Sequence, residues 1–294
     1  MRMRLLCATD LTARSDGALR RTALLAQAMN ADVMLVHAVD DSQSGRRLRM
    51  EVNRAKVHAM TQAERVIPHA IDRVEFVVRL GKRLQVLTSM AREWEPDLIV
   101  MAAPRRTRLQ DVFGTTAERL TIAARRPLLL ANSPAQAPHG RVVLASDLSG
   151  TSAYAARTAA EMGLLANTRT WVVHAFDPAY PGLVAADERT ERVIEEHRRR
   201  WRYDVRRELL RQLEQAGIDH DGVQLSAQAA EPMDAIERLV ERVQPDLLVI
   251  GVSRWVALKR MLIGSVSHQL FQRIQCDMLA VPPPRMHTAL SRAA

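Results

Sequence analysis

The sequence contains the same long segment twice. Residues 5–40 read LLCATDLTARSDGALRRTALLAQAMNADVMLVHAVD, and residues 143–177 read VLASDLSGTSAYAARTAAEMGLLANTRTWVVHAFD. Asp10 and Asp147 occupy the same place in the two copies. The repeats of solenoid proteins are only about 20–50 residues long. Because this repeat is longer, the sequence predicts that a whole domain has been duplicated.

The duplication continues toward the end of each copy. EPDLIVMA at 95–102 matches QPDLLVIG at 244–251, and FGTTAERL at 113–120 matches IGSVSHQL at 263–270. At roughly 100–200 residues per domain, a chain of 294 residues has room for two. We therefore expect a first domain, a Pro- and Ser-containing linker, a second domain and a tail, at residues 1–133, 134–140, 141–283 and 284–294 respectively.

Each half alternates short apolar runs with longer amphipathic ones. The short runs are almost continuously apolar, which is typical of strands covered on both faces. This alternation predicts an α/β fold, a doubly wound parallel sheet with helices on both faces in each half. The expected strands are Leu5–Thr9, Asp32–His37, Val74–Arg79, Leu98–Ala102 and Leu128–Ala131, then Val142–Ser146, Thr170–Ala175, Val223–Gln228, Leu247–Ile250 and Met278–Val281. The expected helices include Ser15–Asn30, Gln43–His69, Lys82–Trp94, Thr115–Arg125 and a highly charged one over Asp187–Gln215.

The composition is typical of a folded soluble protein, and we expect a cytoplasmic one. Hydrophobic residues make up 47% and charged residues 26% of the chain. No apolar run is long enough to span a membrane, and the N-terminus lacks the pattern of a signal peptide. Cys7 and Cys276 lie in apolar runs of different halves, so we expect two buried, reduced thiols and no metal site.

The net charge of +9 raises the question of nucleic-acid binding. The basic residues are nearly all arginines spread through the expected helices, and aromatic residues, which would stack on bases, make up only 4% of the chain. We therefore expect a solvated, arginine-rich surface and no nucleic-acid partner. Arg105, Arg106 and Arg108 form a cluster that fits either a solvated surface or a contact with an anion.

The expected fold places ligands beyond the carboxyl ends of the strands, where the winding of the sheet reverses. Asp10 and Asp147 follow the first strand of each half, and the loop after the fourth strand of the second half ends in Gly264-Ser265. Ser265 opens a helix, and the free N–H groups of a helix N-terminus bind anions. The second half therefore has a candidate anion site.

These segments together resemble the universal stress protein family, in a tandem arrangement. The resemblance covers nearly all of residues 4–282 and rests on the repeated Asp-containing segments, the LVHAVD and VVHAFD strand ends, the two PDL strands and the Gly-Thr and Gly-Ser turns. It implies the strand order 3-2-1-4-5 in each half. It also implies that the halves pack as a pseudo-dimer through their edge strands, Leu128–Ala131 and Met278–Val281, with a further homodimer of the whole chain as an additional expectation.

Many members of this family bind ATP through a loop of glycine, two residues, glycine, nine residues and then Gly-Ser or Gly-Thr. In the second half Gly251, Gly264 and Ser265 match this pattern, while Arg254 stands at the second glycine. The guanidinium of Arg254 either obstructs the loop or replaces a backbone contact to phosphate. The resemblance therefore implies a candidate site for ATP, or another adenine nucleotide, in the C-terminal domain.

The first half keeps less of this loop. Gly114 and Thr115 match, but the alignment places Met101 and Pro104 at the two earlier glycines. Pro104 has no N–H to donate to a phosphate. We therefore expect the site of the first half to be degenerate.

Two pairs of equivalent residues lie near the expected ligand. In the family, an aspartate at the place of Asp10 and Asp147 lies by the adenine and ribose; the alternative role is a helix N-cap or a turn. Asp10 or Ser15 is a possible cap of the first helix. His37 and His174 end the second strand of each half, and their equivalence favours a structural hydrogen bond over metal binding or catalysis.

The sequence shows none of the common catalytic motifs. The phosphate-loop lysine motif, the GxSxG elbow, HExxH and a GxGxxG after the first strand are all missing. We therefore expect a non-catalytic stress-response protein that binds a nucleotide. Two alternatives stay open: a slow ATPase that uses Asp147 and the loop at 251–265, and an adaptor that acts on an unidentified protein partner without a nucleotide.

Overall fold

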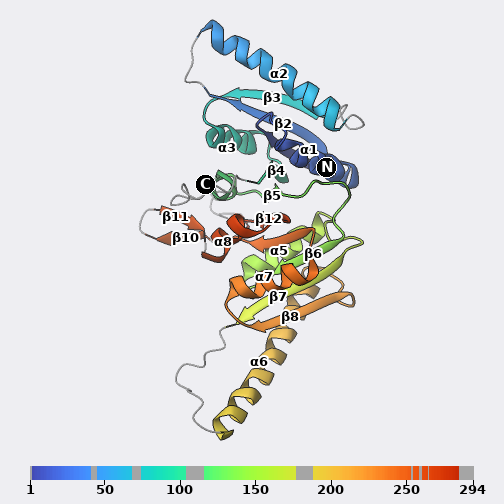
Figure 1. The fold of residues 1–294 in the computed structure, drawn as a ribbon, viewed down its shortest axis with the longest axis vertical. Coiled ribbons are helices and arrows are strands. Elements are labelled where there is room, and N and C mark those ends of the chain that lie inside the picture. Colours follow the sequence, from blue (N-terminus) through green and yellow to red (C-terminus); the bar gives the residue numbers. More distant parts are fainter. Residues whose placement is uncertain are drawn as a thin grey trace, which may run out of the picture.

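Two α/β halves follow each other along the chain, as the repeat predicts (Figure 1). The computed structural model describes residues 2–40, 45–67, 74–103, 116–176, 188–252, 254–257, 260–263 and 265–284. The first half contains β1 (Arg4–Thr9), α1 (Ser15–Met29), β2 (Asp32–Val39), α2 (Arg46–Val66), β3 (Val74–Leu80), α3 (Arg83–Glu93), β4 (Leu98–Ala102), α4 (Thr116–Ala124) and β5 (Leu128–Ala131). The second half contains β6 (Arg141–Ala145), α5 (Gly150–Glu161), β7 (Arg169–Phe176), α6 (Glu188–Gln215), β8 (Val223–Ala229), α7 (Pro232–Val243), β9 (Leu247–Gly251), β10 (Arg254–Ala257), β11 (Arg260–Ile263), α8 (Ser265–Arg273) and β12 (Asp277–Val281).

The strands of both halves form one sheet of ten strands, in the order β3-β2-β1-β4-β5-β12-β9-β6-β7-β8. Within each half the neighbouring strands are parallel and follow the order 3-2-1-4-5, which confirms the order that the family resemblance implies. β5 and β12 pair antiparallel, with Leu129 opposite Leu279. These two leucines are equivalent in the repeat (279−129 = 150), so a pseudo-two-fold axis passes between them. The expected pairing of the two edge strands is confirmed.

Helices cover both faces of the sheet. Helices α1, α2, α5 and α6 pack on one face, and α3, α4, α7 and α8 pack on the other. Alternate strand residues enter opposite cores: Leu98 and Val100 belong to the first core, and Ile99 and Met101 belong to the second. Because both faces of the central strands are covered, these strands are apolar at most positions. Among the described helices, none is long and apolar enough to cross a membrane.

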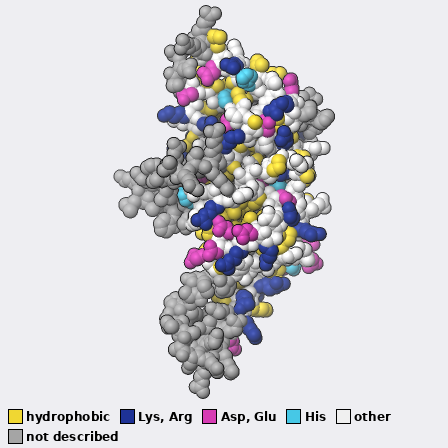
Figure 2. Space-filling model, viewed as in Figure 1, with side chains coloured by type: hydrophobic (Ala, Val, Ile, Leu, Met, Phe, Trp, Pro, Cys, Tyr) yellow, Lys and Arg dark blue, Asp and Glu magenta, His cyan; other side chains and the backbone are white. Residues whose placement is uncertain are grey.

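Charged side chains lie mainly on the outer surface of the helices. Figure 2 shows Lys and Arg interspersed with Asp and Glu on the visible face. Helix α6, which extends from the end of the molecule at β8 (Figure 1), has an ion-paired face that includes Arg211 with Glu208. Its apolar stripe buries Val205, Leu209 and Leu213 against the sheet. The solvated, ion-paired face that the sequence predicts for this helix is confirmed there.

A buried ionic cluster connects the two halves with the linker. Asp277, at the start of β12, is fully buried, and its Oδ2 accepts hydrogen bonds from Nε of Arg21 on α1 (2.7 Å) and Nε2 of His139 in the linker (3.0 Å). Its Oδ1 accepts the backbone N–H groups of Asn132 and Ser133, both at 2.9 Å. We call Arg21, His139 and Asp277 the clasp. Because its members come from the first half, the linker and the second half, the clasp holds all three together.

The clasp makes the stability of the fold sensitive to acid. Burial alone would raise the pKa of Asp277, but the hydrogen bond from His139, the charge of Arg21 and the N–H of Ser133 outweigh burial and lower this pKa below its ordinary 3.8. Ionised Asp277 therefore stabilises the fold above pH 3.8, and this contribution is lost as the pH falls through the lower folded pKa. Below about pH 4 we expect the melting temperature to fall more steeply in the native protein than in an Arg21→Met/Asp277→Leu variant, as followed by circular dichroism. Equal slopes in the two proteins would contradict this role.

The two cysteines are free thiols; Cys7 is buried, as expected, whereas Cys276 is only partly buried. Burial raises the pKa of Cys7 to about 12, against the opposing hydrogen bond with Thr22. Burial, helped by the negative charge of Asp277, raises the pKa of Cys276 to about 12. Both thiols are therefore protonated at neutral pH, which makes them poor nucleophiles.

Candidate functional site

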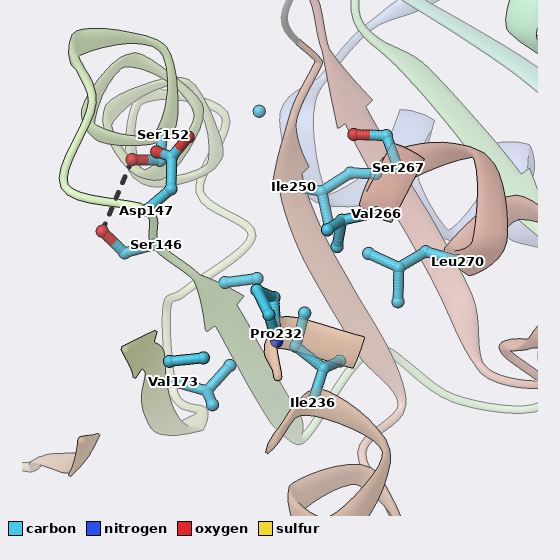
Figure 3. A pocket seen from close by; sticks show the side chains of 13 residues that line it. Ser146, Asp147, Ser152, Val173, Pro232, Ile236, Ile250, Val266, Ser267 and Leu270 are labelled. Atoms are coloured by element: carbon cyan, nitrogen blue, oxygen red, sulfur yellow. Dashed lines mark hydrogen bonds between the residues drawn. The ribbon is translucent and has the colours of Figure 1, made fainter. Parts of the chain in front are cut away.

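A cavity of about 230 Å³ lies beyond the carboxyl ends of β6, β7 and β9 in the second half. This is the position at which an α/β sheet of this winding binds its ligands. Figure 3 shows Ser146, Asp147 and Ser152 on one wall, facing residues of β9 and α8 across the opening. We call this space the C-terminal cavity; it is lined by Ala145, Ser146, Asp147, Ser152, Val173, Ala175, Pro232, Ile236, Ile250, Gly251, Val266, Ser267 and Leu270.

Asp147 supplies the negative charge of the polar wall. Its Oδ1 accepts the backbone N–H of Ser149 at 3.0 Å and so forms the turn that leads into α5. The cap of α5 is Ser149, whose Oγ accepts the N–H of Ser152 at 3.2 Å. Of the two structural roles that the sequence allows, turn and cap, Asp147 therefore has the first. It still lines the cavity, so the turn leaves its carboxylate available to a ligand.

The carboxylate of Asp147 is ionised at neutral pH. Burial would raise its pKa, but hydrogen bonds from Ser149 and Ser152 outweigh burial and lower the pKa below the ordinary 3.8. An ionised carboxylate only accepts hydrogen bonds. The polar wall therefore suits a ligand that presents hydroxyl or amino donors.

Gly251 closes β9 next to the polar wall. A Cβ at this position would lie 2.8 Å from the carbonyl oxygen of Thr151 and 2.9 Å from the backbone nitrogen of Ser152, which is too close for any larger residue. The sequence predicts Gly251 as a residue that lets the backbone approach a phosphate. In the structure the close neighbour is the first turn of α5, so Gly251 places β9 and α5 side by side at the cavity.

The remaining walls of the cavity are mostly apolar. Val173 of β7, Ile236 of α7 and Leu270 of α8 lie around its inner part (Figure 3). Val266 and Ser267, in the first turn of α8, line its other side. The first N–H groups of a helix have no partner within the helix, so this end of the cavity favours an anion.

The structure shows the positions of only some of the residues that the sequence predicts for the phosphate loop. Asp147 and Gly251 line the cavity together. Arg254 opens strand β10 and Ser265 opens α8, but their side chains lie outside the described part of the chain. Other residues named from the sequence also lie outside the described residues: Gly264 in the second half, and Pro104, Arg105, Arg106, Arg108, Gly114 and Thr115 in the first.

The segment between β9 and α8 contains a β-hairpin that the sequence analysis missed. Strands β10 and β11 pair antiparallel, with Trp255 opposite Leu262 and Val256 opposite Met261. The signal was present as two short apolar runs, but a glycine-loop pattern favours an open loop and concealed it. Arg254 therefore begins a strand instead of lying in an extended phosphate loop.

Most apolar residues of the cavity were also missed. Val173 and Ala175 flank His174 on β7. Pro232 and Ile236 belong to α7, a helix without a recognisable functional motif. Ser152 could have been found, because it follows Asp147 by five residues, as Ser15 follows Asp10 in the first half.

The equivalent site of the first half has a different arrangement. Oδ1 of Asp10 accepts three hydrogen bonds, from the N–H (3.0 Å) and hydroxyl (2.6 Å) of Thr12 and from the hydroxyl of Ser15 (3.2 Å). Nη2 of Arg14 donates to the carbonyl oxygen of Ala103 at 2.8 Å, so its side chain crosses from the start of α1 to the end of β4. Thr151, a much shorter residue, is equivalent to Arg14 in the second half (151−14 = 137). In the first half, Asp10 therefore bonds to three neighbouring donors, and Arg14 connects the start of α1 to the residue after β4.

The prediction that Asp10 or Ser15 caps the first helix is wrong. The N-cap of α1 is Arg14, which makes no capping hydrogen bond through its side chain, and Ser15 is already the first helical residue. The physical reason is that Asp10 bonds to Thr12, two residues on, and so builds a turn before the helix begins.

The register of the sheet corrects the alignment of the two loops. Met101 of β4 pairs with Ala8 of β1, and Ile250 of β9 pairs with Ala145 of β6. Ala145 is the residue equivalent to Ala8 in the repeat. Met101 is therefore equivalent to the core residue Ile250, and Ala102 takes the place of Gly251. The prediction that Met101 replaces the first glycine is wrong, because the segment between β4 and its Gly-Thr turn is one residue shorter than the segment after β9.

The two equivalent histidines have a structural hydrogen bond, as expected. Nδ1–H of His37 donates to the carbonyl oxygen of Thr9 at 2.9 Å, and that of His174 donates to the carbonyl oxygen of Ser146 at 2.8 Å. Each bond connects the end of the second strand of a half to the end of its first strand. In the described part of the chain, no three His, Cys, Asp or Glu side chains gather into a potential metal site.

Comparisons with known proteins agree with this architecture. The model of the universal stress protein family matches residues 1–132 and again residues 139–282. A universal stress protein from Archaeoglobus fulgidus DSM 4304 has a similar solved structure over 95% of this chain and 98% of its own, with a TM-score of 0.66 and 14% identity. A functionally unknown protein from Pseudomonas aeruginosa PAO1 is similar over 95% of this chain and 92% of its own, with a TM-score of 0.63 and 16% identity.

A search of curated proteins found no match. The two solved structures are too distant in sequence to indicate more than a shared fold. The two matches of the family model, however, cover both halves of the repeat almost completely. The chain therefore belongs to the universal stress protein family, with two family domains in tandem.

Proposed function

We propose that this chain is a cytoplasmic, non-catalytic stress-response protein that binds ATP or another adenine nucleotide in its C-terminal domain. Membership of the universal stress protein family supports the role in the stress response. The observation that carries the nucleotide proposal is the C-terminal cavity. Its ionised Asp147, its apolar inner wall and the N-terminus of α8 lie around one space.

The three parts of the cavity suit three parts of a nucleotide. The apolar side chains of Val173, Ile236 and Leu270 suit the faces of a base. The carboxylate of Asp147 suits the hydroxyl groups of a ribose, because it accepts hydrogen bonds and has none to donate. Phosphate groups suit the first turn of α8, where backbone N–H groups point outward.

The size of the cavity limits how much of the nucleotide it encloses. Pockets that enclose a whole small molecule usually measure about 300–1,000 Å³. The C-terminal cavity measures about 230 Å³. We therefore propose that it encloses the base and ribose, and that the phosphates lie at its mouth beside α8.

The absence of catalysis is part of the proposal. Hydrolysis of ATP needs a group that positions or deprotonates the attacking water, commonly with a metal ion. Asp147 is held in a turn by Ser149, and its lowered pKa makes it a weak base. These features support binding over turnover.

Replacing Asp147 by asparagine should weaken nucleotide binding by about tenfold or more, because the charged acceptor for the ribose hydroxyls is lost. The matched control is Asp10→Asn, since Asp10 is the equivalent residue of the first half. Isothermal titration with ATP and with AMP should show the loss only for the Asp147 variant. Phosphate release is measured in the same samples.

Three results would count against the proposal. The absence of binding heat and of a thermal shift with millimolar nucleotide would favour a nucleotide-independent adaptor. An equal loss in the Asp10 variant would show that the effect is not specific to the C-terminal cavity. Phosphate release that disappears with Asp147→Asn would show a slow ATPase. Mass spectrometry of small molecules released from the purified protein would identify the ligand directly.

A further inference from the structure

We propose that side-chain contacts between the two halves make each half pair with the other half in preference to a second copy of itself. We call the surface between the two halves the seam; it consists of β5, β12, α4, α8 and the clasp. Its partner is thus the unlike half of the chain. The proposal does not depend on the nucleotide proposal.

The central strands of the seam do not discriminate between like and unlike halves. Leu129 of β5 lies opposite Leu279 of β12, its own equivalent in the repeat. A pair of first halves would place leucine against leucine in the same way, and so would a pair of second halves. Any discrimination must therefore come from side chains other than this pair of leucines.

The first discriminating contact joins two equivalent positions that hold different side chains, a carboxylate and an imidazole. Glu118 of α4 and His268 of α8 are equivalent in the repeat (268−118 = 150), and Oε1 of Glu118 lies 2.7 Å from Nδ1 of His268. The side chain of Glu118 is only 3% exposed. On the far side of the imidazole, Gln272 lies 3.1 Å from Nε2. The pair therefore bridges the pseudo-two-fold axis with one member from each half.

Self-pairing of either half would destroy this contact. Two first halves would bring Glu118 against a second Glu118, and two buried carboxylates at this distance repel each other and cannot both stay ionised. Two second halves would bring His268 against a second His268, with no carboxylate between them. Only the unlike pair places an imidazole N–H opposite a carboxylate.

The clasp is the second discriminating contact, and it occurs on only one side of the axis. Thr158 is equivalent to Arg21 (158−21 = 137), and Pro127 is equivalent to Asp277 (277−127 = 150). Thr158 and Pro127 both line a cavity of about 450 Å³ on the other side of the axis. Two first halves would therefore leave Arg21 opposite Pro127, without its carboxylate.

A pair of second halves would leave Asp277 without the positive charge of Arg21. Asp277, which is fully buried, would face Thr158 instead of Arg21. A buried charge that loses its partner is strongly destabilising. The two contacts thus reject self-pairing by both halves, and they do so by independent side chains.

The test uses the full chain and imitates the seam of a first-half self-pair. His268→Glu places a second glutamate opposite Glu118, and we expect its melting temperature to fall by roughly 5–10 °C at pH 8. In His268→Gln the new side chain has nearly the size of glutamate but no charge. The melting temperature of this variant should therefore fall by less than half as much as that of His268→Glu. The exchanged variant Glu118→His/His268→Glu restores an unlike pair and should regain most of the loss. Circular dichroism gives the melting temperatures, and light scattering gives the mass of each species.

Each outcome decides the proposal. A His268→Glu variant as stable as His268→Gln would overturn it, because the charge would then have no effect. An exchanged variant no more stable than His268→Glu would also overturn it, because the unlike pair would then not be what the seam recognises. If His268→Glu fails to fold, recovery of a folded protein in the exchanged variant supports the proposal, and failure there removes it.

Discussion

Replacing Asp277 by alanine is expected to lower the free energy of unfolding by about 3–5 kcal/mol, the loss usually seen when one partner of a buried ion pair is removed. Arg21 is only 3% exposed, so its charge would remain buried without a carboxylate beside it. The backbone N–H groups of Asn132 and Ser133 would lose their acceptor as well. Equilibrium unfolding in urea, followed by circular dichroism, measures the change.

Two control variants separate the clasp from a general effect of losing charge. Arg21→Met/Asp277→Leu removes both charges and fills the space with apolar atoms, so it should lose less stability than Asp277→Ala. Glu161→Ala removes the pair between Arg157 and Glu161, whose side chains are 48% and 67% exposed, and should cost less than about 1 kcal/mol. An Asp277→Ala variant no less stable than Glu161→Ala would show that the clasp does not hold the halves together.

Gly251→Ala is the second change for which we expect a large effect. The added Cβ would lie 2.8 Å from the carbonyl oxygen of Thr151 and 2.9 Å from the nitrogen of Ser152, both backbone atoms that cannot rotate away. The first turn of α5 must therefore move, at a cost of about 1–3 kcal/mol for overpacking. Because Asp147 lies in the turn before α5, we expect nucleotide affinity to fall at least about tenfold in the same variant, as measured by titration calorimetry.

The first half supplies a matched control for this change. Ala102 is the residue equivalent to Gly251, so that half already accommodates a Cβ beside α1. Ala102→Gly should change stability by no more than about 1 kcal/mol, the usual difference between these residues, and should leave nucleotide binding unchanged. A Gly251→Ala variant that binds nucleotide as the native protein does would show that α5 can shift without disturbing the cavity.

Features carried by local pattern were predictable from the sequence. The apolar runs gave the strands, and the repeat gave two halves of one kind. The family resemblance gave the strand order and the pairing of β5 with β12. The repeat also predicted the structural role of His37 and His174, because a hydrogen bond needed by the scaffold is kept in both copies. Asp147 and Gly251, which the sequence singles out, line the same cavity in the structure.

Features that depend on distant parts of the chain were not predictable. The clasp joins Arg21, His139 and Asp277, and none of them stands out in its own segment. Part of the apolar lining of the cavity comes from α7, a helix that carries no motif. The sequence alignment placed Met101 at the position of Gly251, where the structure has Ala102. The alignment was counted from the Gly-Thr turn across a loop that is one residue shorter in the first half, and the register of the sheet shows the difference.

The antiparallel pairing of β5 with β12 has a consequence for how the protein responds to dilution. In a pair of separate domains, the shared sheet would come apart as the protein concentration fell below the dissociation constant. Here the linker keeps the two partners at an effective concentration on the order of millimolar, however dilute the chain is. The architecture of the sheet is therefore independent of how much protein the cell makes. With the pairing secured in this way, the first half can lose its own ligand site and still serve as a permanent support for the second.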